Sequence, residues 1–318
     1  MKAIVIHEAG GPEKLLYEDV PTPDVKPGWS LVKVKGFGIN HSEIFTRKGY
    51  SPSVKFPRIL GIECVGVIEK STDEKRLPVG QKVISIMGEM GRAFNGSYAE
   101  YALLPNKQIY PVDTDLSWPE LAAVPETFFT AYGSFKNLHI NSSDKVFVRG
   151  ATSGVGVAFA KLVKGKFPNI YLAGSSRKLD RADRLKKVGF DEVIVDTDNE
   201  LQTDEKFTKV LDLIGPKAMK DTFKHVTAGG IVCSSGKLGN QWDLAGFDPV
   251  ADLAPNSSLT SFSSSNVSAS FLNEMLQFIV DHKIDVKPEK VFDLKHVPDA
   301  HRFLESGHSF GKVVVINE

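Results

Sequence analysis

A glycine-rich turn constrains the fold of this chain more than any other feature of its sequence. The β-type run Val146–Arg149 leads into Gly150-Ala151-Thr152-Ser153-Gly154-Val155-Gly156, and a helical pattern follows at once. Glycines let the backbone approach a pyrophosphate, whose charge is met by the free N–H groups and the positive dipole end of the helix. The spacing is G-x-x-x-G-x-G, so the order of strand, turn and helix carries the prediction of a dinucleotide site. The alternative is a turn that only permits close helix packing.

The turn belongs to a series of alternating strand and helix patterns that begins near Leu121. Residues from Val155 to Val163 have helical spacing, and a second helix is predicted over Leu179–Val188. This rhythm is typical of parallel βαβ units, and six strands make a complete dinucleotide fold. The strand candidates are Lys145–Arg149, Ile170–Ala173, Glu192–Val195, Val210–Ile214, Ile231–Ser234 and Ser258–Phe262.

The two ends of the chain have a different pattern. Short apolar runs separated by Gly and Pro predict a compact, mostly β barrel or sandwich from Met1 to about Val112. After the amphipathic stretch Phe271–Ile279, the β-like runs Val291–Leu294 and Lys312–Ile316 indicate that the tail rejoins this first part. The early runs are Ala3–Ile6, Leu31–Val34, Val65–Ile68, Val83–Ile86 and Tyr98–Leu104.

The end of the second strand in the series bears on the choice of cofactor. About 20 residues beyond the turn, an NAD site presents Asp or Glu to the ribose hydroxyls. This chain has Ser175-Ser176-Arg177-Lys178 there. Hydroxyls and two cations suit a ribose 2′-phosphate, whereas an acid would repel it. The sequence therefore predicts NADPH rather than NADH; the alternative is that Arg177 and Lys178 are solvated charges at a helix start.

Composition argues against several classes of function. The chain of 318 residues has 39 basic and 39 acidic side chains, so it lacks the basic excess that nucleic-acid binding usually requires. No stretch is long enough to cross a bilayer and no signal peptide is visible, so we expect a cytoplasmic protein. Cys64 and Cys233 cannot form a Cys-only zinc site, and we predict that both are buried as small apolar residues.

Segments spread over nearly the whole chain are specific in combination. In addition to the turn, they are Gly38-Ile39-Asn40, Leu60 to Ile68, Gly96 to Tyr101, Phe129-Thr130-Ala131-Tyr132 and Gly311-Lys312-Val313-Val314. Together they resemble the zinc-independent quinone oxidoreductase branch of the medium-chain dehydrogenase/reductase superfamily. The resemblance implies an α/β protein, and it also implies a homodimer. A GroES-like, mostly β catalytic domain over residues 1–120, completed by 286–318, would accompany a Rossmann-type doubly wound parallel sheet domain over 121–285.

The resemblance also bears on metal binding. Zinc-dependent relatives use a Cys in the segment matching Gly38–Ser42 and a His in a Gly-His-Glu segment. Here Asn40 and Ile62 stand at these places, and neither is a good zinc ligand. His41 is the one nearby residue that favours a metal. We therefore predict no metal site and regard a zinc-dependent alcohol dehydrogenase as the weaker alternative.

Without zinc to polarise a carbonyl, hydride transfer favours an acceptor that already delocalises negative charge, such as a quinone or an enone. By resemblance, Asn40 would donate a hydrogen bond to the developing oxyanion, Thr127 and Thr130 would lie beside the nicotinamide and its ribose, and Tyr50 would close the pocket. Many relatives carry a Tyr where this chain has Phe45. That loss keeps open a second class of function, a nucleotide-binding redox sensor or interaction module without turnover.

Further cofactor contacts are implied by the same resemblance. Relatives often place a Tyr near the adenosine phosphate where this chain has Asp196, which weakens the preference for NADPH. Glu63 is expected to be structural, satisfying nearby backbone or an Arg. The residues expected to contact the cofactor are Gly150, Ser153, Gly154, Val155, Gly156, Ile214 and Gly236, with Ser175 to Lys178 at the ribose.

Overall fold

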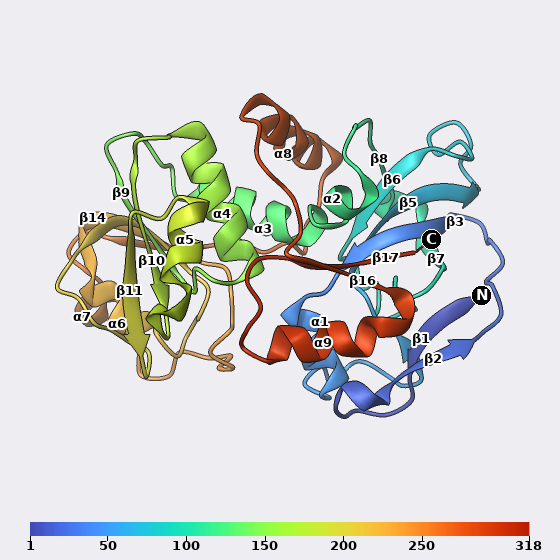
Figure 1. Ribbon diagram of the computed structural model, residues 1–318, viewed down its shortest axis with the longest axis horizontal. Helices are drawn as coiled ribbons and strands as arrows, with labels where there is room; N and C mark the ends of the chain where they lie inside the picture. The colour runs from blue at the N-terminus through green and yellow to red at the C-terminus, as the bar shows by residue number, and fades with distance from the viewer. Residues whose placement is uncertain (318) are drawn as a thin grey trace. The chain divides into compact units, whose positions relative to one another are not determined.

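The computed structural model describes residues 1–317, which divide into two compact units (Figure 1). The first unit contains residues 1–126 and 265–274, together with Val286 to the end of the described chain. The second unit contains residues 127–264 and 275–285. Two helices contain residues of both units, α3 (Pro125–Asn137) and α8 (Ala269–Asp281).

The first unit is built on two β-sheets. The larger sheet has the strand order β16-β17-β3-β5-β6-β8, with β7 paired to β3, and the smaller has the order β2-β1-β4. The strands are β1 (Lys2–Ile6), β2 (Leu15–Asp19), β3 (Trp29–Gly38), β4 (Arg58–Ile59), β5 (Glu63–Lys70), β6 (Lys82–Ile86), β7 (Tyr101–Pro105), β8 (Tyr110–Pro111), β16 (Lys290–Asp293) and β17 (Val313–Ile316). The helices are α1 (His41–Arg47), α2 (Trp118–Ala122) and α9 (Val297–Glu305), with 3-10 turns at Pro12–Lys14, Asn106–Gln108 and Leu294–His296.

The tail of the chain completes the larger sheet, as the sequence predicted. β17 pairs antiparallel with β3, and Val314 lies opposite Gly38. The side chains of Val313 and Val315 are fully buried in the core that β1, β3 and β5 also supply. Cys64 is buried in this core too, and Cys233 is buried in the second unit, as predicted.

A buried histidine joins α9 to α1 in the first unit. Nδ1 of His301 lies 3.3 Å from an Arg47 guanidinium nitrogen, and Nε2 lies 3.0 Å from the Tyr98 hydroxyl. Arginine can only donate, so Nδ1 accepts and Nε2 carries the proton that is donated to Tyr98. Burial, followed by the charge of Arg47, lowers the pKa of His301 to about 3. The ring is therefore neutral at physiological pH.

This depressed pKa predicts a loss of stability in acid. Below pH 6.5, the ordinary pKa of histidine, His301 is protonated in the unfolded chain but stays neutral in the folded protein. The free energy of unfolding therefore falls as the pH is lowered from 6.5 to about 3. His301→Gln removes this titration. As the pH falls, we expect the difference in free energy of unfolding between wild type and variant to shrink by up to about 1.4 kcal/mol per pH unit. Urea unfolding at several pH values measures it. The exposed residue His308, replaced by Gln, is the control, and a gap that stays constant with pH would count against the assignment.

The second unit contains a seven-stranded sheet in the order β12-β11-β10-β9-β13-β14-β15. Numbered along the chain, its six parallel strands have the order 3-2-1-4-5-6 of a dinucleotide-binding fold, which confirms the predicted class. Its strands are β9 (Lys145–Arg149), β10 (Tyr171–Ser176), β11 (Glu192–Thr197), β12 (Glu200–Leu201), β13 (Phe207–Asp212), β14 (Val226–Ser234) and β15 (Ser258–Ser261). Its helices are α4 (Gly154–Lys166), α5 (Ala182–Val188), α6 (Met219–Lys224) and α7 (Pro249–Asp252), with a 3-10 turn at Leu179–Arg181.

Right-handed crossovers place α4 and α5 on one face of this sheet and α6 on the other (Figure 1). The stacked rings of Phe147 and Phe207, 4.6 Å apart, pack in the core between adjacent strands. The fourth strand differs from the prediction, because β13 ends at Asp212 rather than Ile214. The Asp212 carboxylate accepts the N–H of Gly215 at 2.7 Å, and this bond turns the chain out of the sheet.

Candidate active site

The glycine-rich turn joins β9 to α4 in the predicted order. Gly150 has φ +89°, a left-handed conformation that favours glycine. Ser153 is the N-cap of α4, where its hydroxyl oxygen accepts the N–H of Gly156 at 3.1 Å and the hydroxyl donates to the carbonyl of Gly150 at 2.8 Å. The other N–H groups of the first turn have no intrahelical partner and are available to an anion.

The turn also lies very close to the helix that it opens. A Cβ atom at Gly156 would come within 2.7 Å of the Gly150 carbonyl oxygen and 2.8 Å of that of Ala151. No side chain fits there, so the bare backbone forms a shallow cradle at the helix N-terminus. These residues fit the pyrophosphate of a dinucleotide, with Ser153, Gly154 and Val155 as the residues that would hold it.

Four of the predicted cofactor residues meet at the carboxyl ends of neighbouring strands. The Gly150 N–H donates to the Ser175 hydroxyl at 3.0 Å. A Cβ at Gly150 would lie 3.6 Å from Ile214, and one at Gly236 would lie 2.4 Å from the carbonyl oxygen of Leu213. This edge, where β9 and β13 adjoin and the strand order reverses, is where doubly wound sheets bind their ligands.

The remaining predicted residues have different settings. Ser176 is nearly buried, while Arg177 and Lys178 are exposed directly after β10. Thr127 and Thr130 are buried in α3, and the Ser134 hydroxyl donates to the Thr130 carbonyl at 2.8 Å. Tyr50 is 58% exposed in the first unit, with its ring centroid 6.4 Å from that of Phe45.

Asn40 belongs to a buried polar cluster in the first unit. The side-chain N–H groups of Asn40 donate to Glu63 at 2.8 Å and, at 3.4 Å, to Glu43. Its carbonyl oxygen accepts from the Lys312 ammonium at 2.7 Å. The amide thus makes three polar contacts within the protein, and its role as a donor to the acceptor stays a prediction.

Glu63 is the centre of this cluster and is fully buried. One oxygen accepts from Lys312 at 2.7 Å, and the other accepts the backbone N–H of Glu126 at 2.6 Å. The carboxylate satisfies backbone and a cation, as the sequence analysis expected, although the cation is a lysine rather than an arginine. The sequence analysis gave no role to Glu43 or Lys312.

Glu43 is the second carboxyl group of the cluster. It is 1% exposed, and its Oε2 is a buried atom without a hydrogen-bond partner. Burial, followed by the charge of Glu63, raises the pKa of Glu43 to about 8. One ammonium therefore compensates Glu63 while Glu43 holds its proton at neutral pH.

A raised pKa predicts that stability falls as the pH rises. Between pH 4.5 and about 8 the unfolded chain has lost a proton that folded Glu43 retains, so folding weakens by up to about 1.4 kcal/mol per pH unit. Glu43→Gln keeps the shape without the ionisation. From pH 5 to pH 8 we expect the free energy of unfolding of the wild type to fall relative to that of Glu43→Gln. Exposed Glu74, replaced by Gln, is the control in the same urea titrations, and parallel curves for wild type and Glu43→Gln would contradict the prediction.

The cluster does not fit a zinc ion. Asn40 and Glu63, the two oxygen donors that face each other here, both bind the Lys312 ammonium, and a metal cation would have to displace it. Ile62 supplies no ligand. Among residues 1–317, no group of three His, Cys, Asp or Glu side chains is arranged to hold a metal.

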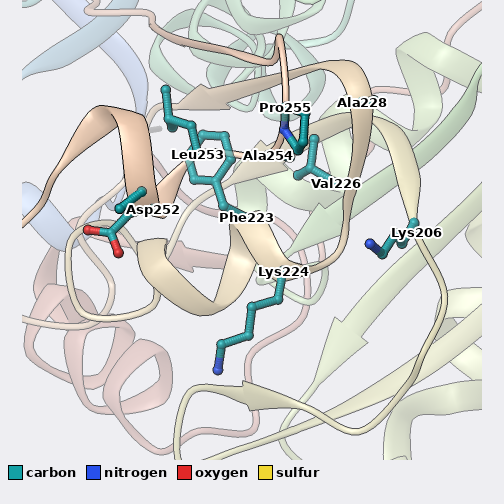
Figure 2. A pocket seen from close by; sticks show the side chains of 10 residues that line it. Lys206, Phe223, Lys224, Val226, Ala228, Asp252, Leu253, Ala254 and Pro255 are labelled. Carbon is teal, nitrogen blue, oxygen red and sulfur yellow. The ribbon is translucent and has the colours of Figure 1, made fainter.

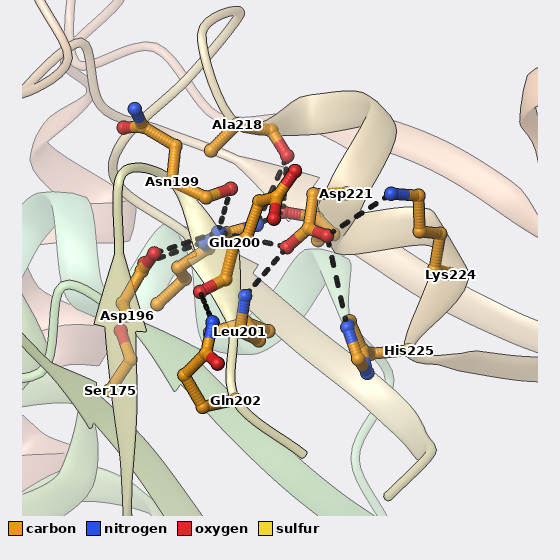
Figure 3. A network of polar contacts seen from close by, with 12 residues as sticks. Ser175, Asp196, Asn199, Glu200, Leu201, Gln202, Ala218, Asp221, Lys224 and His225 are labelled. Atoms are coloured by element: carbon orange, nitrogen blue, oxygen red, sulfur yellow. Dashed lines mark hydrogen bonds and ion pairs between the residues drawn. The ribbon is translucent and has the colours of Figure 1, made fainter. Parts of the chain in front are cut away.

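A buried charge network lies near the carboxyl ends of the parallel strands in the second unit (Figure 3). Arg149, fully buried, makes two bonds to Asp196, at 2.8 and 3.0 Å, and an ion pair with Asp221 at 3.0 Å. It also donates to Thr222, which in turn donates to Asp212. The sequence analysis took Asp196 to weaken the preference for NADPH, and it did not foresee the pairing of this carboxylate with Arg149. The missed signal was an arginine directly after the apolar run Val146–Val148 of a central strand.

A hollow of about 390 Å³ lies elsewhere in the second unit (Figure 2). Its lining includes Lys206 and Val226, which stand at the amino ends of β13 and β14, together with Phe223, Lys224 and Leu253. Doubly wound sheets bind ligands at the carboxyl ends of their strands. The hollow is therefore at the opposite edge from the glycine-rich turn and is not the nucleotide site.

No helix within the described part of the chain has the length and apolar character needed to cross a membrane.

Comparison with known proteins agrees with this geometry. The family described as alcohol dehydrogenase GroES-like domain matches residues 26–114, and the family described as zinc-binding dehydrogenase matches residues 188–315. A putative quinone oxidoreductase, YhfP of Bacillus subtilis, is 31% identical over 69% of this chain and 69% of its own length. The quinone oxidoreductase of Pongo abelii is 32% identical over 52% of this chain, and the match covers only half of that protein.

Solved structures share the fold over the full length. The structure of Bacillus subtilis protein yhfP with NAD bound has a TM-score of 0.85 and 24% identity, covering 99% of each chain. Mycobacterial Rv1454c complexed with NADPH has a TM-score of 0.84 and 22% identity, covering all of both chains. The chain therefore belongs to the medium-chain dehydrogenase/reductase superfamily, in its quinone oxidoreductase-like branch.

Proposed function

We propose that this protein is an NADPH-dependent, zinc-independent oxidoreductase that transfers a hydride to a quinone or an α,β-unsaturated carbonyl compound. The observation that carries the proposal is the turn Gly150–Gly156, where three glycines bring the backbone close to the N-terminus of α4 and the helix offers N–H groups to a pyrophosphate. The names of the relatives, quinone oxidoreductases, support the substrate class.

The chemistry of the chain's own residues favours such an acceptor. When bound, NADPH supplies the hydride. The Lys312 ammonium occupies oxygens of Asn40 and Glu63 that would otherwise attract a metal, which supports a reaction without a metal ion to polarise a simple carbonyl. Quinones and enones spread the arriving negative charge over their own conjugated atoms, and the protein has only to align the two reactants.

The preference for NADPH rests on the segment after β10. Arg177 and Lys178 are exposed cations beside the Ser175 and Ser176 hydroxyls, a set of groups suited to a phosphate. The carboxylate of Asp196, which alone would disfavour a phosphate, is paired with Arg149. We further propose a homodimer in the cytoplasm, and sedimentation analysis tests the dimer.

Two measurements test the function. Chelator-treated protein is expected to consume NADPH when a naphthoquinone or an enone is added, and no turnover over a broad panel of acceptors would contradict the reductase. Arg177→Ala is expected to weaken the binding of NADPH by at least about tenfold relative to that of NADH, because a charged hydrogen bond to the 2′-phosphate is lost. Tight NADPH binding without turnover would favour the sensor alternative.

A further inference from the structure

Asp196 lies beside the segment that is proposed to hold the ribose phosphate. The β10–β11 ladder pairs Ser176 with Val195, so Asp196 follows level with Arg177 on the adjacent strand. Neighbouring strands are about 4.8 Å apart. A carboxylate at this place is therefore close enough to act on a phosphate at the end of β10.

An unpaired carboxylate at this edge would oppose a 2′-phosphate and favour ribose hydroxyls. In this chain both oxygens of Asp196 are occupied by one guanidinium. Nε of Arg149 lies 2.8 Å from one oxygen and a terminal nitrogen lies 3.0 Å from the other. The pair is bidentate and nearly removed from solvent, with Arg149 fully buried and Asp196 8% exposed.

Further bonds hold the guanidinium in one position. Arg149 donates to the carbonyl oxygens of Ala218 at 3.0 Å and Asn199 at 2.6 Å, and to the Thr222 hydroxyl at 2.8 Å. Asn199 belongs to the turn between β11 and β12, so the same side chain also fixes the backbone that follows Asp196. Figure 3 labels Asp196, Asn199 and Ala218, three of the residues that accept hydrogen bonds from Arg149.

From this geometry we propose that Arg149 determines nucleotide specificity. It neutralises and immobilises Asp196, and so makes the carboxyl end of β10 and β11 receptive to the ribose 2′-phosphate of NADPH. Arg149 acts through Asp196 and is a positioning residue, because its own side chain is sequestered within the network. The inference rests on the proposed function, which supplies the nucleotide.

The test compares dissociation constants of NADPH and NADH, measured by direct fluorescence titration of the full-length protein without any acceptor. Arg149→Gln is expected to lower the preference for NADPH by at least about tenfold, about 1.4 kcal/mol. The double variant Arg149→Gln with Asp196→Asn is expected to return to within about threefold of the wild-type preference, because the carboxylate beside the phosphate is gone while Asp221 keeps its ion pair with Lys224 at 3.5 Å. Exposed Arg302, replaced by Gln, is the matched control.

Two further variants keep the test decisive if Arg149→Gln does not fold. Arg149→Lys retains the charge but not the bidentate geometry, so its preference for NADPH is expected to lie between those of Arg149→Gln and the wild type. Asp196→Asn removes the carboxylate and is expected to keep the wild-type preference within about threefold. An Arg149→Gln protein that loses NADPH and NADH equally, or an Asp196→Asn protein that loses the NADPH preference by tenfold, would overturn the inference. A wild type that binds neither nucleotide would instead defeat the proposed function itself.

Discussion

Lys312→Met is expected to lower the free energy of unfolding by about 3–5 kcal/mol, the cost of leaving a buried charge without its partner. The ammonium compensates Glu63 at 2.7 Å, and both side chains are nearly inaccessible, at 6% and 0% exposure. Methionine fills a similar volume but carries no charge, so Glu63 would stay ionised among apolar groups or take up a proton. Urea unfolding at neutral pH measures the loss.

A second substitution separates lost charge from lost packing. Lys312→Met combined with Glu63→Gln leaves a neutral pair, and we expect it to recover most of the stability. The exposed pair Arg302–Asp299 provides the matched surface case, where Arg302→Met is expected to cost no more than about 1 kcal/mol. A loss below about 1 kcal/mol for Lys312→Met would show that the ion pair does not stabilise the first unit.

Gly156→Ala is expected to weaken NADPH binding by at least about tenfold and to lower the free energy of unfolding by about 1–3 kcal/mol. The added methyl group would meet backbone atoms of Gly150 and Ala151 at 2.7 to 2.9 Å, and backbone cannot move aside as a flexible side chain can. The turn would have to open, and the N–H groups at the start of α4 would move with it. Fluorescence titration and urea unfolding measure the two effects.

Gly165 offers a matched control on the same helix. A Cβ there would overlap only the terminal methyl group of Ile284, the end of a flexible side chain, and would make ordinary contact with His282 at 3.4 Å and beyond. Alanine also has the higher helix propensity. We expect Gly165→Ala to keep nucleotide affinity within about twofold of the wild type. If Gly156→Ala bound NADPH equally well, the pyrophosphate would not rest on this turn.

Local signals made much of the second unit predictable. β9 has the predicted bounds around the apolar run Val146–Val148, and the turn that follows carries its own glycines, so strand, turn and helix are all encoded within neighbouring residues. The end of β13 was predicted two residues too late because Leu213 and Ile214 continue the apolar run. The strand ends because the Asp212 carboxylate accepts the N–H of Gly215, and the apolar pattern of the sequence does not predict this hydrogen bond.

Long-range polar pairing explains what the sequence analysis missed. Arg149 and Asp196 are 47 residues apart, and Lys312 and Glu63 are 249 residues apart. Nothing in the local pattern of either segment identifies its partner. Asn40, the predicted donor, is an example, because its side-chain oxygen accepts a hydrogen bond from Lys312, which lies near the other end of the chain.

The pairing of β17 with β3 has a consequence for the order of folding during synthesis. All seven strands of the second unit have been made before Val313–Ile316 emerges, whereas the larger sheet of the first unit still lacks an internal strand at that stage. The second unit can therefore fold while the first unit is still incomplete and β3 lacks its partner β17. Such a nascent edge is exposed to aggregation until the last strand arrives.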